Sequence, residues 1–409
     1  MIKVQIKWFA MAALTACAVL STPPASAQKQ YDPGASDSEI KIGQTAPFSG
    51  PGSAYATISK AEAAYFRMIN EQGGINGRKI NLIAYDDGYN PAKTVEQTRK
   101  LVESDGVLLM FGSLGSAHNA AVQKYLNDDK IPQLSLATGA TRFSDPVKFP
   151  WTMAANPNYQ TEARIYGRYV LENHPGGKIG ILYQNDDFGK DYVIGLKKAP
   201  GDKAASMIVA EAAYEPTDPT VDSQIVRPKS AGADVFYNIS TPKFAAQAIR
   251  KIRELDWKPV HIMTVNSSSV GGVLKPAGLD LSRGIISVNW GKGPGDPTWD
   301  NDSGMKKWRA FMDQYYPEGD KNSSFNTYGY GTAQTLEKML RACGDNLTRE
   351  NVMKQFTNMK DVELDLLLPG IVMNTSPTDY RMIKRLQMMR FNGERWEGFG
   401  PIIAGDLNG

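Results

Sequence analysis

The sequence predicts an α/β protein made of two doubly wound lobes, and three observations lead to this fold class. Strand-like and helix-like segments alternate from residue 40 onward, which is typical of parallel sheets with crossover helices. The alternation restarts after "WTMAANP", residues 151–157, without a low-complexity linker. A chain of 409 residues is also too long for one ordinary hydrophobic core, so two domains are expected.

The first run of elements is expected to form the first lobe. Its strands are short apolar segments that end in polar or glycine-rich residues, and helix-length segments separate them. In order, the expected elements are strands at 40–46 and 79–87, a helix from Pro91, a strand at 107–112, a helix over 120–130 and a strand at 132–138.

The second run repeats this order and is expected to form the second lobe. A long helix-like stretch over 329–342 follows it, and the alternation of the tail predicts a final strand pair with a turn at Asn392-Gly393. The expected elements are a helix over 159–172, a strand at 178–186, a helix opening near Phe188, strands at 207–214 and 234–240, a helix over 242–256 and a strand at 261–265.

Residues 1–27 have the layout of a secretory signal peptide. Two lysines precede an apolar stretch at 8–20, and the small residues "ASA" end it, so cleavage is expected after Ala27. The apolar stretch is shorter than the roughly 20 residues that span a bilayer. Lipid attachment at Cys17 is the alternative, although Cys17 lies inside the apolar stretch. We therefore expect an exported, periplasmic protein without a membrane-spanning segment.

Charge and cysteine content narrow the possible partners. The formal charge of the whole chain is +3, and loss of the leader with Lys3 and Lys7 lowers it to +1. Such a balance gives no basic field for nucleic acid or anionic lipid. Without Cys17, Cys343 has no partner for an internal disulfide, so stability is expected to come from a large core.

The residues that carry catalysis or hold metals do not assemble into a known pattern. Only three histidines are present, and none has metal-ligand spacing. Neither a nucleophile elbow nor a P-loop occurs. Gly50-x-Gly52 follows a strand, but Tyr55 stands where a dinucleotide fingerprint needs a third small residue. We expect no catalytic residue, metal or cofactor, so the protein is predicted not to be an enzyme.

Loops with glycine and hydroxyl residues follow two strands of the first lobe. "FGSLGSAHNAA" at 111–121 leads into a helix for which Ser116 is a good N-cap, and "LATGATRF" at 136–143 contains Thr138, Gly139 and Thr141. Such loops meet at the carboxyl edge of a parallel sheet, where N–H groups and hydroxyls can hold a carboxylate. The alternative is that Ser116 only caps its helix and Thr138 only closes a turn.

Four segments together resemble one family. "IKIGQTAPFSGPGSAYA", "GGINGRKINLIAYDDGYNP", "GSLGSA" and "YQNDDFGKDY" are similar to the leucine/isoleucine/valine-binding proteins, which are type I periplasmic binding proteins of ABC importers. The resemblance implies two Rossmann-like lobes joined by three crossovers, with the ligand captured by hinge closure. It implies an N-terminal lobe of 36–155 plus 288–368 and a C-terminal lobe of 156–287 plus 369–404. It also implies a membrane permease as partner and a monomeric state.

The resemblance also assigns a ligand site. The carboxylate of the ligand would be held by Ser116 and by the loop of Ala137, Thr138, Gly139 and Thr141, in which Gly139 replaces a family threonine. Tyr55 and Phe188 match aromatic positions of the family, and Phe325, Tyr328 and Phe48 are further candidate aromatics. Asp86 and Asp87 are expected to shape a loop and cap the next helix, and Asp186 and Asp187 to lie at the cleft edge.

The departure from the family lies in the second lobe. Asn266 occupies the position of the glutamate that neutralises an amino acid's ammonium, and a tyrosine that assists it aligns near Thr241. Asn266, Ser267 and Ser268 are suited to a neutral hydroxyl or carbonyl. We expect a carboxylate with an aromatic or branched apolar body, such as a benzoate, a phenylpropenoate or a 2-oxo acid. A true branched-chain amino acid binder, with Asp186 or Asp187 facing the ammonium, and a ligand-sensing receptor of the same fold remain alternatives.

Overall fold

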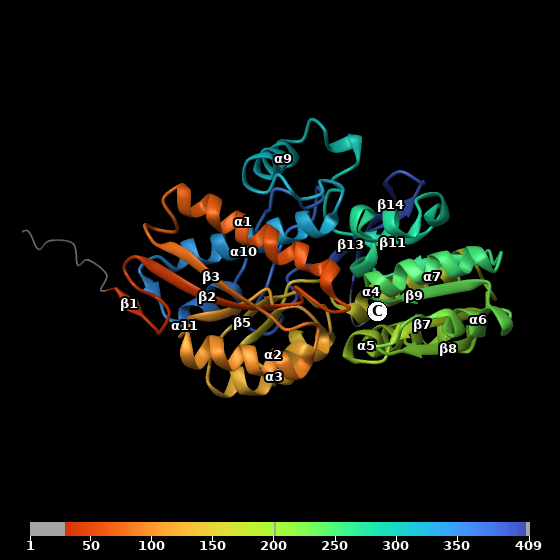
Figure 1. Ribbon diagram of the computed structural model, residues 1–409, viewed down its shortest axis with the longest axis horizontal. Coiled ribbons are helices and arrows are strands. Elements are labelled where there is room, and N and C mark those ends of the chain that lie inside the picture. The colour runs from red at the N-terminus through yellow and green to blue at the C-terminus, as the bar shows by residue number, and fades with distance from the viewer. Residues whose placement is uncertain (1–28, 200–201, 406–409) are drawn as a thin grey trace, which may run out of the picture.

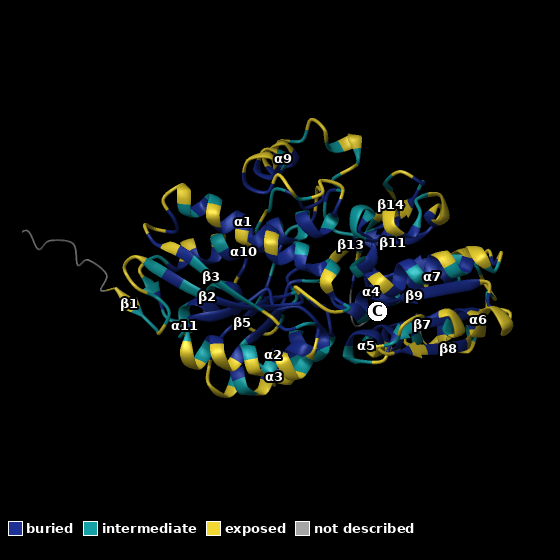
Figure 2. Ribbon diagram, in the orientation of Figure 1, coloured by how far each residue is buried: buried dark blue, intermediate teal, exposed yellow. Residues whose placement is uncertain are grey.

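The computed structural model describes residues 29–199 and 202–405, which form two lobes side by side. Each lobe is built on one open sheet with helices on both faces, and the central strands are the most deeply buried elements (Figures 1 and 2). The predicted signal peptide and Cys17 lie outside the described residues. Within the described ranges, no helix is long and apolar enough to cross a membrane.

The N-terminal lobe contains a five-stranded sheet in which neighbouring strands are parallel. Its order is β3 (Lys79–Asp86), β2 (Glu39–Ala46), β4 (Leu109–Phe111), β5 (Gln133–Leu136) and β6 (Thr152–Ala154). The helices of this lobe are α1 (Ala56–Glu71), α2 (Pro91–Arg99), α3 (Ser116–Asp128), α9 (Ser303–Tyr315), α10 (Ser324–Cys343) and α11 (Arg349–Phe356). A small parallel pair, β1 (Gln30–Tyr31) with β12 (Asn346–Leu347), closes its outer end.

The C-terminal lobe contains a seven-stranded sheet that is parallel except at one side. The antiparallel pairs join β13 to β11 and to β14, as the predicted final strand pair requires. The order is β14 (Trp396–Ala404), β13 (Arg385–Phe391), β11 (Ile286–Asn289), β10 (Val260–Met263), β9 (Val235–Ile239), β7 (Ile179–Gln184) and β8 (Ile208–Tyr214). The helices are α4 (Tyr159–Asn173), α5 (Asp187–Lys197), α6 (Asp222–Ser230), α7 (Pro242–Glu254) and the short α8 (Lys275–Ala277).

The local sequence explains these elements. Every residue of β9, "VFYNI", is buried, as a central strand covered on both faces demands. Helix α7 buries Ala245, Ala248, Ile249 and Ile252, a helical spacing that turns one apolar face to the sheet. The cap of α2 corrects one expectation. Asn90, and not an aspartate of the preceding loop, accepts hydrogen bonds from the first N–H groups of that helix.

The two aspartates before α2 shape the loop instead. Asp86 accepts hydrogen bonds from the amides of Ser49 and Gly88, at 3.1 and 2.9 Å. Asp87 is buried and accepts bonds from the amide of Tyr89 and the hydroxyl of Thr94. These bonds tie the loop after β3 to the loop after β2, so both loops are fixed where they meet the second lobe.

Between residues 29 and 405 the chain passes from one lobe to the other three times. The first passage, 155–158, joins β6 to α4, the second follows β11 at 289–292, and the third, 369–384, leads back to β13. The side chain of Trp290 in the second passage packs against the hydrophobic cores of both lobes. A cavity between the lobes is lined by residues of all three passages, so lobe rotation about them would change its shape.

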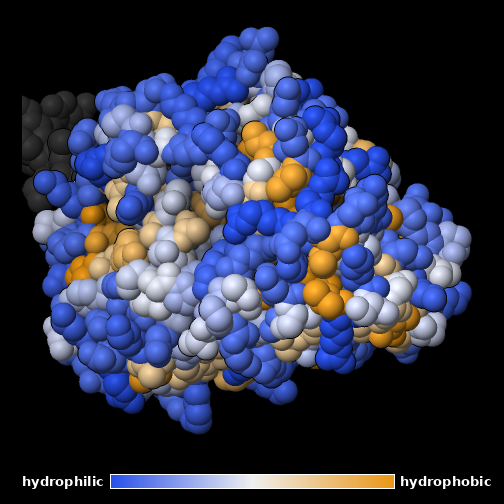
Figure 3. Space-filling view, turned by 45° about the vertical axis from the view of Figure 1, so that its right-hand side comes forward, coloured by the Kyte–Doolittle hydropathy of each residue, from blue (hydrophilic) through white to orange (hydrophobic). Residues whose placement is uncertain are grey.

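Outside the lobe cores, apolar side chains are scattered. The large apolar residues that remain exposed are separate from one another in the chain, and the face drawn in Figure 3 is mostly hydrophilic with apolar residues in separate groups. Cys343 is a free, buried cysteine on α10.

Candidate ligand-binding cleft

A cavity of about 210 Å³ lies between the lobes. Its walls come from loops that follow parallel strands in both sheets, which is where doubly wound folds bind ligands. From the N-terminal lobe it is lined by Leu114, Gly115 and Ser116 after β4 and by Ala137 after β5. From the C-terminal lobe it is lined by Phe188 after β7, Thr241 after β9 and Val265 and Asn266 after β10.

Ser116 lines the cavity but does not cap its helix, contrary to expectation. The N-cap of α3 is Gly115, whose φ of 103° is a conformation that glycine adopts readily. Ser116 is the first helical residue, and its hydroxyl is 2.7 Å from that of Thr138. Thr138 is fully buried, and it also accepts a hydrogen bond from the amide of Ala140. Thr138 therefore lies behind the cavity wall and positions Ser116.

Gly139 and Thr141 are also not brought to the cavity surface. A Cβ atom on Gly139 would lie 2.1 Å from the carbonyl oxygen of Pro157 and 2.7 Å from Cδ1 of Tyr159. Gly139 therefore makes room for the ring of Tyr159. The amide and the hydroxyl of Thr141 both donate to Asp191, at 2.8 and 2.9 Å, which links the first lobe to α5.

Tyr159 is the residue of this wall that sequence reasoning missed. It lines the cavity, its ring stacks on Tyr192 with centroids 4.5 Å apart, and it meets Phe188 edge-on at 5.5 Å. Burial raises the pKa of Tyr159, while the neighbouring polar groups of Thr138, Gly139 and Ser116 oppose that rise. Tyr159 thus brings a neutral hydroxyl to the place predicted for the carboxylate. The sequence feature that points to Tyr159 is Gly139, which has no side chain to occupy the space of the tyrosine ring.

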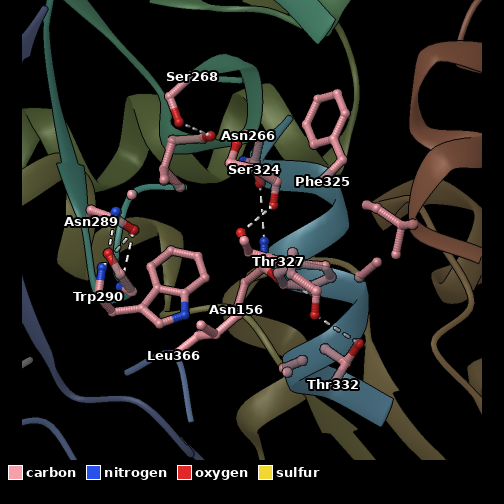
Figure 4. A pocket seen from close by; sticks show the side chains of 18 of the residues that line it. Asn156, Asn266, Ser268, Asn289, Trp290, Ser324, Phe325, Thr327, Thr332 and Leu366 are labelled. Carbon is pink, nitrogen blue, oxygen red and sulfur yellow. Dashed lines mark hydrogen bonds between the residues drawn. The ribbon is translucent and has the colours of Figure 1, made fainter. Parts of the chain in front are cut away.

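Asn266 sits in a network of neutral hydrogen bonds, as Figure 4 shows in part. Its side-chain nitrogen donates to the hydroxyls of Tyr192 and Thr264, at 3.2 and 3.1 Å. Its side-chain oxygen accepts from Asn156, at 3.0 Å, and the hydroxyl of Tyr328 donates to Asn156 at 2.5 Å. The network connects α10 of one lobe to the loop after β10 of the other.

The neighbouring polar residues of the C-terminal lobe are turned toward the protein. The hydroxyl of Ser267 donates to the carbonyl of Ser240, and that of Ser268 donates to the carbonyl of Val265. Thr241 lines the cavity, but its amide donates to the hydroxyl of Tyr214 at 2.9 Å. These residues fix the loop shapes rather than present free groups.

Aromatic rings form much of the remaining wall. Tyr55 and Phe325 line the cavity with ring centroids 5.2 Å apart, and Tyr328 lines it one helical turn beyond Phe325 on α10. The hydroxyl of Tyr55 donates to the carbonyl of Asn266 across the cleft, at 3.1 Å. Phe48 does not line the cavity, and it is 37% exposed at the tip of the loop after β2.

Carboxyl groups surround the cleft but do not line its centre. Burial raises the pKa of Glu62 to about 8 and that of Asp186 to about 6, and it also raises the pKa values of Glu162 and Asp191. All four lie behind the wall and accept hydrogen bonds from protein groups. Among the described residues, the charged side chains that line the cavity are Lys292 of the second passage, Asp296 shortly after it, and Glu394 and Arg395 in the turn between β13 and β14.

The two candidate aspartates after β7 have structural partners. Asp186 is the N-cap of α5 and accepts hydrogen bonds from the amides of Phe188 and Gly189. Asp187 forms an ion pair with Arg142 of the other lobe, at 2.9 Å. Neither lines the cavity, so the cleft contains no acidic group at the position occupied by Asn266.

The lobes are closed on each other. Besides the bonds of Tyr55 and Thr141, Gln184 donates to the hydroxyl of Tyr89 at 3.2 Å, and the hydroxyls of Ser269 and Ser323 are 3.1 Å apart. Each of these pairs joins one lobe to the other. Across the part of the chain that the structure describes, no group of three or more His, Cys, Asp or Glu side chains is placed to hold a metal ion.

Comparison with known proteins agrees with this architecture. The model of the periplasmic binding protein family matches residues 39–395. The Leu/Ile/Val-binding protein homolog 1 of Brucella abortus (strain 2308) is 25% identical over 355 residues, which cover 83% of this chain and 91% of that protein.

Two solved structures share the fold. A branched chain amino acid ABC transporter from Thermus thermophilus with bound valine has a TM-score of 0.81 at 16% identity, over 91% of this chain and 98% of that one. A fatty acid ABC transporter substrate-binding protein from Thermomonospora curvata has a TM-score of 0.74 at 21% identity, over 93% and 96% of the two chains. This chain therefore belongs to the periplasmic binding protein family and has the two-lobed fold of these solved structures.

Proposed function

We propose that this protein captures a small carboxylate with an apolar or aromatic body and delivers it to the membrane permease of an ABC importer. Aromatic acids and branched 2-oxo acids are the favoured ligands. The observation that carries this proposal is Asn266, a neutral amide held by neutral partners in the wall where a binder of amino acids needs a carboxylate.

An amino acid whose ammonium faced Asn266 would lack a counter-charge at that position, because the acidic side chains that line the cavity, Asp296 and Glu394, belong to the segments after the second passage and after β13. Burying an unpaired charge costs several kcal/mol as an order of magnitude. The nearby carboxyl groups Glu162 and Asp186 are already occupied by the amides of Val265 and Phe188 and do not line the cavity. A ligand without an ammonium avoids this cost.

The N-terminal wall supplies neutral donors for a carboxylate. Ser116 and Tyr159 bring hydroxyls to the first turn of α3, where the helix dipole adds a partial positive charge. Thr138 orients Ser116 from behind through their 2.7 Å contact. Donors fixed in this way replace the water that the carboxylate loses when the lobes close.

The rest of the cleft suits an apolar body. Tyr55, Phe325 and Phe188 present their rings to the cavity, and the polar groups around them bond to the protein. Of the two solved structures named above, one contains bound valine and the other is the substrate-binding protein of a fatty acid ABC transporter, so the shared fold admits more than one ligand class. The residues that line the cleft therefore determine which ligand class is bound.

Capture is proposed to proceed by hinge closure of a monomeric protein in the periplasm, after removal of the signal peptide. The open protein binds the solute on its N-terminal lobe, and the lobes then close through bonds such as Tyr55 to Asn266. The permease recognises the closed form, and no covalent bond of the solute is broken.

The test is a thermal-shift and calorimetric screen of matched pairs. Leucine, valine and phenylalanine are compared with their 2-oxo acids, and benzoate and phenylpropenoate are added. We expect the deaminated or aromatic acids to stabilise the protein and bind more tightly. Tight binding of leucine or valine, with none of the matching 2-oxo acids, would instead establish the second candidate, a branched-chain amino acid receptor, which the Brucella relative's name favours.

A further inference from the structure

The cavity does not end at the inter-lobe cleft. It continues past Asn156 into a compartment beside the hinge, and all three inter-lobe passages contribute to its lining. Asn156 comes from the first passage, Trp290 from the second and Met382 from the third. In Figure 4, Asn156 lies between Trp290 and Thr327 of α10, with Leu366 near the indole ring. We call this part of the cavity the hinge compartment.

The hinge compartment presents mainly apolar atoms. Its lining side chains from the third passage and the segment before it are aliphatic or thioether groups, and Trp290 adds a large ring. They are Leu364, Leu366, Leu367, Met373, Met382 and Ile383. The polar side chains of α10 here bond to the protein, since Thr327 donates to the carbonyl of Ser324 and Thr335 donates to that of Gly331. An apolar occupant would therefore leave these groups satisfied.

A glycine keeps this space open. Gly331 lies in the middle of α10 and lines the cavity, and a Cβ atom placed on it would meet nothing within 4 Å. Gly329, two residues earlier, differs, because its Cβ would lie 2.6 Å from the carbonyl oxygen of Ile58 on α1. Close helix packing explains Gly329 but not Gly331. Glycine destabilises a helix interior relative to alanine, so Gly331 lowers helix stability and leaves volume in the compartment.

From this geometry we infer that the hinge compartment receives the distal apolar part of the ligand, which makes the ligand an extended carboxylic acid rather than a compact one. The inference rests on the proposed capture of a carboxylate and adds the length of its body. The occupant is the tail of the same ligand because the compartment and the cleft form one continuous cavity. A chain that enters it touches all three passages, so its binding and hinge closure are coupled.

The test measures affinity against ligand length by isothermal titration calorimetry. Two series are used, from butanoate to decanoate and from phenylacetate to phenylhexanoate. In the unmodified protein we expect binding to tighten by about fourfold for each methylene that enters the compartment. In Gly331→Leu the side chain fills the compartment, and we expect affinity to stop rising with length.

Gly331→Ala serves as the second variant, because a single methyl group is accommodated without contact and supports the helix. It should shift the preferred ligand by about one methylene toward shorter acids, and thermal melting confirms that both variants fold. Short acids that bind as tightly as long ones, with the same length profile in all three proteins, would overturn the inference and leave the proposed function intact. Binding of amino acids but of no carboxylic acid in either series would contradict the proposed function itself.

Discussion

Replacement of Asn266 by aspartate tests the central electrostatic feature of the cleft. The change is isosteric, but it removes the two hydrogen bonds that Asn266 donates to Tyr192 and Thr264. Each such bond contributes about 0.5–1.5 kcal/mol to stability. The hydroxyl of Thr264 already donates to Tyr192, at 2.6 Å, and that of Tyr192 donates to Glu162, at 2.7 Å. The new carboxylate would therefore face oxygen atoms whose protons are engaged.

These losses set the expected size of the effect. Two lost bonds remove about 1–3 kcal/mol from the free energy of unfolding of the ligand-free protein. A charge-assisted bond from Asn156, which donates to position 266 at 3.0 Å, offsets part of this loss. For ligand selectivity, the introduced charge repels a carboxylate and attracts an ammonium. We expect the affinity ratio of leucine to its 2-oxo acid to rise by about a hundredfold, which corresponds to ~2.7 kcal/mol.

The assay is isothermal titration calorimetry with leucine and its 2-oxo acid on the unmodified protein, Asn266→Asp and Asn266→Ala. The alanine variant breaks the same hydrogen bonds without adding charge, so it separates loss of structure from change of electrostatics. The reasoning is refuted if a folded Asn266→Asp protein keeps the affinity ratio of the unmodified protein. It is also refuted if the alanine variant changes the ratio as much as the aspartate variant does.

Three further predictions concern residues around this site. Tyr159→Phe keeps the ring stack with Tyr192 but removes the hydroxyl near Ser116. Calorimetry should therefore show carboxylate binding weakened about tenfold, while the free energy of unfolding changes little. Unaltered affinity would exclude that hydroxyl from the site. Burial raises the pKa of Glu62 to about 8 from an ordinary value of 4.5, so the folded state binds this proton more tightly than the unfolded state does. The contribution of Glu62 to the free energy of unfolding should therefore fall progressively as pH rises from about 4.5 to about 8. Urea unfolding of Glu62→Gln across that range should show a shallower decline than the unmodified protein, and equal slopes would contradict the buried neutral carboxyl. Gly331→Ala should raise the free energy of unfolding by ~0.5–1 kcal/mol because its methyl group meets open space; a loss of stability would mean that the space is filled.

Much of the fold could be predicted because its strands are short apolar runs covered by helices. The segments at 79–87, 178–186 and 234–240 lie on β3, β7 and β9, each within about two residues of the expected ends. The helix expected from Gly329 begins earlier, at Ser324, because its first turn carries polar residues that periodicity does not register. The hydrophobic pattern of a segment predicted whether it is a helix or a strand. The residue at which a helix starts depends on capping contacts, which that pattern does not contain.

The site was predicted less completely, because its loops pack against residues distant in the sequence. Ser116, Phe188 and Asn266 line the cavity, while Thr138, Gly139 and Thr141 lie behind it, and ligand binding by any of them stays a prediction. That difference depends on the ring of Tyr159, which belongs to the next helix and lacks a motif of its own. The hinge compartment was not predicted, because the side chains from the three passages that line it share no spacing in the chain.

Trp290 has one more consequence for this molecule. Its indole ring touches the cores of both lobes and lines the cavity, at the pivot about which the lobes would turn. Any rotation of one lobe changes what surrounds this ring, and so does a solute chain placed beside it. The chain contains seven tryptophans. The fluorescence of a variant that retains only Trp290 would therefore report lobe opening and filling of the cavity without an attached dye.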